Sequence, residues 1–147
     1  MKDVSKPYRL AIFAALTGQL TYNTLAVPVY DEKQAVTGDE KVFVLLSTQT
    51  STPERADNLF ARHASIDIEI IAKTGSEISK DVIDDVGDEI LTILFPSYGV
   101  FGVTVPSGWQ FAEAFYDSEI SRVFEISQTE SILRKIIKIS AIIVQQL

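Results

Sequence analysis

The sequence contains no cysteine among its 147 residues, and it has a single histidine, a single tryptophan and a single methionine. The absence of cysteine excludes disulfide scaffolds, zinc sites built on thiolates, iron–sulfur clusters and thiol nucleophiles. Long apolar runs are also missing, because Gly18 and Gln19 interrupt the N-terminal apolar stretch and no later run reaches the ~18 residues of a membrane span. We therefore expect a soluble protein made inside the cell, with no membrane partner.

Basic residues are scarce in the middle of the chain. Residues 31–130 carry a net charge of −12, whereas residues 1–30 carry +2 and residues 131–147 carry +3. Affinity for nucleic acid comes mainly from Lys and Arg side chains that displace counterions from phosphates, so this distribution argues against nucleic-acid binding. The basic C-terminal segment would find its acidic partner in the same chain or in a neighbouring copy.

The composition is that of one globular domain. Apolar residues make up 46% of the chain and charged residues 22%, which excludes intrinsic disorder. The length suits a single domain that covers residues 1–147. A mean hydropathy of +0.16 alongside this charge indicates more apolar surface than a monomer needs, as expected where neighbouring subunits cover part of it.

Two segments show the period of an amphipathic helix. Apolar side chains recur at every fourth position in the first segment, which predicts a helix from Lys6 to Thr21. The same period returns over residues 79–94, and Pro96 ends that helix. The two apolar stripes consist of Tyr8, Ile12, Leu16 and Leu20 in the first helix and Val82, Val86 and Ile90 in the second.

Strands are predicted at residues 27–30, 41–48 and 64–72. The first two are rich in β-branched and aromatic residues. The third alternates isoleucine with Asp67 and Glu69, the pattern of a strand with one buried face and one face in water.

Two long polar loops are predicted at residues 31–40 and 49–60. Loops of this length in a compact domain are usually functional or mobile, so we expect them to contact partners and to be ordered mainly in an assembled particle. The segment 96–118 is rich in glycine and aromatic residues, and only a short strand over residues 100–105 is predicted within it.

The C-terminal region predicts a long β-hairpin. Residues 121–127 alternate apolar and polar side chains, residues 128–130 suit a turn, and residues 132–144 hold seven β-branched residues in thirteen positions. Such a strand would extend for roughly 43 Å, more than twice the usual length, so we expect part of it to reach beyond its own domain. The predicted fold class is α+β, with a mostly antiparallel sheet and both helices packed on one face.

Catalytic and phosphate-binding motifs are not found. The seven glycines are scattered, and Ser107 lacks the first glycine of a nucleophile elbow. His63 could act with Ser65 or Asp67 in a small hydrolase, or it is an ordinary loop histidine. Asp67 and Glu69 could form an acid–base pair, although the alternation of a strand explains them without chemistry.

Acidic residues gather on one face of the second predicted helix. Asp81, Asp84, Asp85 and Asp88 have the spacing to hold Mg²⁺ or Ca²⁺, but a solvent-facing surface is the simpler interpretation. We predict no catalytic residue, no metal ligand and no cofactor, and therefore a protein that is not an enzyme.

Two groups of residues are candidates for a subunit or partner interface. Aromatic residues alternate along one segment: Trp109, Phe111 and Phe115. They form either an aromatic binding platform or part of the core or of a subunit contact. In the last strand, Arg134, Lys135 and Lys138 are expected near acidic groups of a neighbour, where their charges would set register and partner choice.

The order of the predicted elements carries a family resemblance. A helix is followed by a short strand that ends in Val-Tyr-Asp (residues 29–31), by a second strand and a polar loop, and by the alternating strand around residues 67–71. An amphipathic helix and a hairpin containing Arg-Lys-Ile-Ile (residues 134–137) complete the chain. Over nearly its whole length, this pattern resembles the tail-terminator or tail-completion family of tailed bacteriophages.

The resemblance implies a structural virion protein that forms a homo-oligomeric ring, a hexamer, at the head-proximal end of the tail. Such a ring caps the tail tube and joins it to the head–tail connector proteins, and DNA passes through its lumen without specific binding. The resemblance also implies synthesis in the cytoplasm of a bacterial host, a final location in the tail or neck, and no catalytic site. Two alternatives stay open, a head–tail adaptor that binds the portal and a small hydrolase that uses His63.

Overall fold

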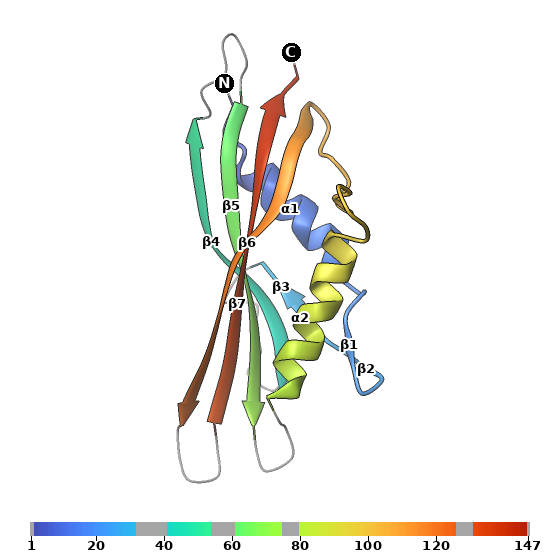
Figure 1. Ribbon diagram of the computed structural model, residues 1–147, viewed down its shortest axis with the longest axis vertical. Helices are drawn as coiled ribbons and strands as arrows, with labels where there is room; N and C mark the ends of the chain where they lie inside the picture. The colour runs from blue at the N-terminus through green and yellow to red at the C-terminus, as the bar shows by residue number, and fades with distance from the viewer. Residues whose placement is uncertain (1, 32–40, 54–60, 75–79, 126–130, 147) are drawn as a thin grey trace.

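The structure is a computed structural model, and it describes residues 2–31, 41–53, 61–74, 80–125 and 131–146. Within these ranges it contains two helices, a two-stranded sheet and a five-stranded sheet (Figure 1). The elements in chain order are α1 (Ser5–Leu16), β1 (Thr21–Tyr22), β2 (Leu25–Ala26), β3 (Val29–Tyr30), β4 (Val42–Pro53), β5 (Ala61–Thr74), α2 (Asp81–Leu94), β6 (Trp109–Glu125) and β7 (Ser131–Gln145).

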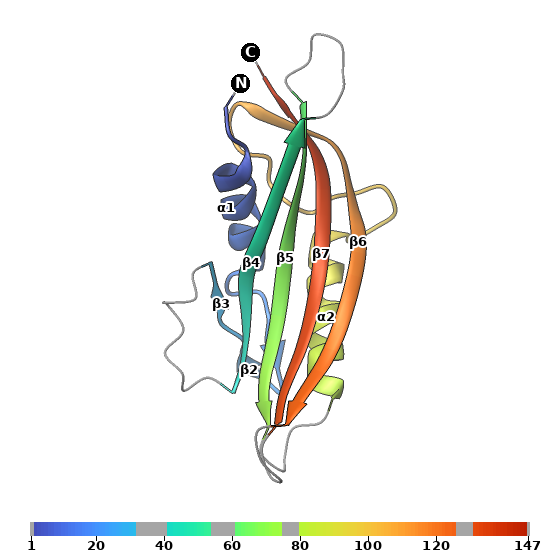
Figure 2. The ribbon, with the colours of Figure 1, turned by 90° about the vertical axis from the view of Figure 1, so that its left-hand side faces the viewer.

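The five-stranded sheet has the strand order β3-β4-β5-β7-β6. Only β3 and β4 run parallel, and the other neighbours are antiparallel. Both helices pack on the same face of this sheet. Figure 2 looks onto the opposite face, so that the helices lie on the far side of the strands. The α+β class, the mostly antiparallel sheet, the two helices on one face and the C-terminal hairpin of β6 and β7 are thereby confirmed.

The core lies between the helices and the sheet. Isoleucines at alternate positions of β5 point toward the helices and are fully buried, while the residues between them face the other way. The Tyr8 hydroxyl, which α1 places in this core, donates a hydrogen bond to the carbonyl oxygen of Ile139 (3.0 Å). The central buried residues are Ile12, Leu16, Ile66, Ile68, Ile70, Val82, Val86, Ile90, Ile137 and Ile139.

Helix α1 ends earlier than predicted. It stops at Leu16 rather than Thr21, because Thr17 is extended and Gly18 has a positive φ of 76°. Helix α2 ends at Leu94 as predicted, and its predicted first residue at position 79 lies outside the described residues.

The sequence prediction is wrong for most of the segment before β7. No strand forms over residues 100–105, which are irregular apart from one isolated bridge between Ser97 and Val100. Strand β6 begins at Trp109, not at residue 121. Two bulges, after Phe111 and after Tyr116, break the two-residue period from which a strand is predicted.

Strands β4 and β7 differ from prediction in extent. Strand β4 continues to Pro53, so residues 49–53 are not part of a loop. Residues 32–40 and 54–60, and the predicted turn at 128–130, lie outside the described residues. Strand β7 pairs with β6 from Ser131 to Gln145 and with β5 from Ser131 to Val144. The expectation that it reaches beyond its own domain is wrong, because β5 and β6, with 14 and 17 residues, are long enough to flank the 15 residues of β7.

We expect Ile68→Asp to lower the free energy of unfolding by about 3–5 kcal/mol, since Ile68 is fully buried and the new carboxylate would have no partner. Thermal denaturation should show a melting temperature at least about 10 °C lower. Thr52→Asp, at an exposed position of β4, is the matched control and should change it little. Equal melting temperatures for the two variants would contradict the placement of Ile68 on the buried face of β5.

Candidate functional site

The sheet face opposite the helices, here called the open face, brings polar and apolar side chains of neighbouring strands together. No element in the described ranges covers it (Figure 2). Its central residues come from alternate positions of β5 and β7, and most of them are half-buried by their neighbours in the sheet. They are His63, Ser65, Asp67, Glu69, Ile71 and Lys73 on β5 and Ile132, Arg134, Ile136, Lys138, Ser140, Ile142 and Val144 on β7.

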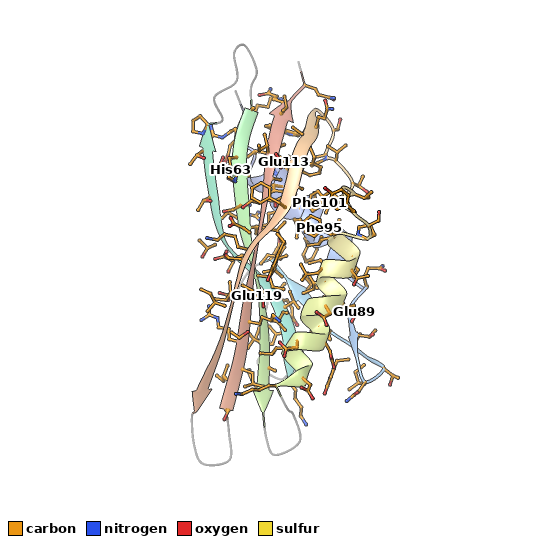
Figure 3. The ribbon with its side chains drawn as sticks, in the orientation of Figure 1. His63, Glu89, Phe95, Phe101, Glu113 and Glu119 are labelled. Atoms are coloured by element: carbon orange, nitrogen blue, oxygen red, sulfur yellow. The ribbon has the colours of Figure 1, made fainter. Side chains whose placement is uncertain are left out.

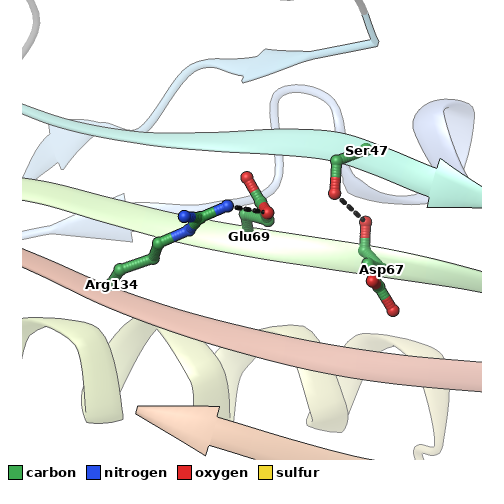
Figure 4. Close-up of polar contacts among 4 residues, drawn as sticks. All are labelled: Ser47, Asp67, Glu69 and Arg134. Atoms are coloured by element: carbon green, nitrogen blue, oxygen red, sulfur yellow. Dashed lines mark hydrogen bonds and ion pairs between the residues drawn. The ribbon is translucent and has the colours of Figure 1, made fainter. Parts of the chain in front are cut away.

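Two carboxylates of β5 meet two cations of β7 at the centre of the open face. Arg134 forms an ion pair with Glu69, which is only 6% exposed (Figure 4). Asp67 lies opposite Lys138 in the strand register. Arg134 therefore meets an acidic group of its own chain, and its predicted contact with a neighbour's acid stays a prediction.

Asp67, on this surface, has a carboxyl group with a raised pKa. Its Oδ1 atom is buried and has no hydrogen-bond partner among the described residues. Its backbone carbonyl accepts a hydrogen bond of 3.5 Å from Ser47 (Figure 4). Burial raises the pKa of the Asp67 carboxyl above its ordinary value of 3.8, an effect that Lys138 opposes and Glu69 reinforces.

The raised pKa of Asp67 makes its contribution to stability depend on pH. The folded chain holds the Asp67 proton more tightly than the unfolded chain, so this contribution is complete below the ordinary pKa and is lost as pH rises through the folded one. Asp67→Asn cannot ionise. Its melting temperature, relative to the unaltered protein, should therefore increase from about pH 4 to about pH 7.

The matched control for Asp67→Asn is Asp85→Asn, because Asp85 is exposed on α2. Its melting-temperature difference from the unaltered protein should change little over the same pH range. If the melting temperature of Asp67→Asn relative to the unaltered protein stays constant or falls as pH rises, the raised pKa of Asp67 is contradicted.

A shallow groove of about 600 Å³ runs beside the Glu69–Arg134 pair. Its walls are mainly aromatic and aliphatic, from Phe43, Leu45, Ile71 and neighbouring side chains. The Lys73 ammonium lies 5.7 Å from the centre of the Phe43 ring, a cation–π contact. The groove thus combines an apolar floor with charged groups at its rim.

The three residues of the hydrolase hypothesis share the open face but are engaged elsewhere. The His63 ring packs edge-on against Phe115, with 5.7 Å between ring centres. The Ser65 hydroxyl shares a hydrogen bond with Thr50. Among the described residues no hydrogen bond joins His63 to Ser65 or to Asp67, and positions two apart on a strand are about 6–7 Å apart. The structure brings the three to one face without linking them in a proton relay.

Lys135 lies on the opposite face of β7, under α2. It is 7% exposed, and its ammonium lies 3.0 Å from Asp84 Oδ1 and 3.5 Å from Glu119 Oε2. Burial lowers the pKa of Lys135, but the hydrogen bonds and charges of the two carboxylates outweigh burial and raise it overall. The Lys135 stem passes directly beneath Gly87 of α2, where an added Cβ atom would lie 3.4 Å from it. Lys135 therefore joins α2, β6 and β7 within one chain.

Trp109 and Phe111, predicted at an interface, belong to the chain's own core or pack against it. Trp109 is 6% exposed, and Phe111 makes edge contacts with Tyr8 and Phe101. The bulge after Phe111 reverses which positions face the helices. Phe115 consequently points to the open face, so the three aromatic residues do not form one platform. The bulge places Phe115 on a different face of the sheet from Trp109 and Phe111. The alternation in the sequence could not indicate this change of face.

The acidic residues of α2 face solvent, as the simpler interpretation predicts. Asp81, Asp84, Asp85 and Asp88 are all exposed. In the described part of the chain no group of three or more acidic or histidine side chains is placed to hold a metal ion. Within the same ranges no helix is long and apolar enough to cross a membrane.

Comparison with known proteins leaves the family open. No protein-family model matches the sequence, and no curated protein matches it at a significant level.

Proposed function

We propose that the protein is a structural subunit of a phage tail, a tail terminator whose copies form a ring at the head-proximal end of the tail tube. One observation carries this proposal. The chain folds into the element order on which the resemblance to terminators rests: α1, the short strand β3 beside β4, β5, α2 and the hairpin of β6 and β7.

The two edges of the sheet support self-association. Among the described residues, strand β6 pairs only with β7, and the part of β4 beyond Leu46 pairs only with β5. Unpaired strand edges are surfaces on which another chain can pack. Because the two edges differ, contact between them is heterologous, the type of contact that closes into a ring.

The charge of the chain suits a channel for DNA. The net charge is −7, and acidic side chains line much of α2 and β6. A surface of this sign repels phosphate and releases few counterions on contact with DNA. In this proposal DNA passes through the ring without specific binding, and the lasting contacts are with the tail tube protein and the head–tail connector proteins.

The first test is the mass and shape of the purified full-length protein. Size-exclusion chromatography with light scattering should give one discrete oligomer, six copies by the resemblance, and negative-stain electron microscopy should show annular particles. A protein that stays monomeric at every concentration from 1 to ~100 μM, well above typical assembly constants, would overturn the proposal.

Binding to isolated tail parts distinguishes the terminator from the adaptor. Rings should cap the ends of purified tail tubes, whereas binding to purified portal alone would support the head–tail adaptor instead. His63→Ala should leave ring formation unchanged, because His63 lies on the open face and not at either sheet edge. Hydrolysis of a test ester by the unaltered protein that is lost in His63→Ala would favour the hydrolase.

A further inference from the structure

The two edges of the molecule carry different features. At one edge of the sheet, α1 lies alongside the upper half of β4 (Figure 2). At the other edge, the segment that follows α2 projects beyond β6 (Figure 2). A second copy placed beside the first would bring these two edges together.

The β6 edge contains a groove lined by aromatic and small side chains together with one carboxylate. The groove measures about 390 Å³ and lies between residues 95–101 and residues 112–114 of β6. Tyr98 is fully exposed there and Val100 is 46% exposed. The exposed Glu113 lines the groove and lies close above the aromatic pair of Phe95 and Phe101 (Figure 3).

The α1 edge carries an apolar ridge with a basic end. Lys6, Leu10 and Ala14 are spaced four residues apart and form the exposed stripe of α1, opposite the buried stripe. Leu10 is 43% exposed. The ridge thus presents an aliphatic side chain one helical turn from an ammonium group. The groove offers apolar side chains and a carboxylate, which could bind these two groups.

We propose that α1 of a second copy docks in this groove, with Leu10 inserted beside Tyr98 and Val100 and with Lys6 facing Glu113. The inference rests on the proposed function, because it identifies the contact by which copies would join into a ring. The partner is a second copy since one chain carries both halves of the contact. Ridge and groove lie at different edges, so the contact repeats from copy to copy.

Strand direction and charge favour the same arrangement. Strand β6 runs antiparallel to β7, and β7 runs in the direction of β4, so β6 of one copy would lie antiparallel to β4 of the next. The register places Thr50 of β4 and Phe115 of β6 in one row across the sheet. The charged residues of β6 from Trp109 to Ser121 are all acidic, whereas the one exposed charge on α1, that of Lys6, is basic. Opposite charges of this kind set orientation and suppress wrong pairings.

Disulfide trapping tests the contact directly, because the chain has no cysteine. Two single variants, Leu10→Cys and Val100→Cys, are purified separately, mixed and oxidised. The mixture should yield a disulfide-linked heterodimer in at least about tenfold excess over a matched mixture of Leu10→Cys with Asp85→Cys, whose cysteine lies on the exposed face of α2. Equal yields in the two mixtures would overturn the proposed contact.

Charge reversal gives an independent readout. Lys6→Glu and Glu113→Lys should each weaken self-association about tenfold, the equivalent of about 1.4 kcal/mol per contact. Mixing the two variants should restore assembly, because every contact in an alternating ring again joins opposite charges. Asp85→Lys is the matched control and should assemble normally. Failure of the mixture to recover would overturn the role of the Lys6–Glu113 pair.

The outcomes separate this contact from the proposed function. Rings that form in the unaltered protein without the heterodimer would overturn the contact while the terminator proposal stands. A heterodimer and charge rescue that are accompanied only by open chains or dimers would support the contact and overturn the ring.

Discussion

The central strands β5 and β7 place their isoleucines on one face, and this face must be removed from water. Ile66, Ile68 and Ile70 of β5 lie beside Ile137 and Ile139 of β7, and all five are fully buried. At about 25 cal/mol per Å² of apolar surface, such burial is the largest favourable contribution to folding. It draws α1 and α2 onto the same side of the sheet and leaves the other side without a helix.

The open face and the two sheet edges follow from that arrangement. With both helices on one side, the polar positions of β5 and β7 meet solvent, and their charges are neutralised within the chain by pairs such as Glu69 with Arg134. Strand β6 stays at the edge because no described element follows it in the sheet. Its two bulges and its acidic residues limit unspecific edge pairing, as edge strands of natural proteins commonly do. A specific partner must therefore match shape and charge together.

The elements with a regular period could be predicted from the sequence, and the irregular ones could not. Helix α2 and strand β5 follow their apolar periods, so the prediction identified both and the face that each buries. Strand β6 was predicted only from residue 121, because its bulges shift the alternation twice within eight residues of Trp109. The partners of Arg134 and Lys135 were also beyond prediction, since Glu69 and Asp84 are 65 and 51 residues away in the chain. The groove beside Glu113 depends on the same irregular strand and carried no signal in the sequence.

The central claim is that copies of this chain join side by side through unlike edges. Single-particle cryo-electron microscopy of the purified protein tests it most directly. The account predicts a closed ring in which α1 and β4 of each copy lie against β6 of the next. A two-fold dimer that buries the open faces against each other, or particles no larger than one chain, would contradict it.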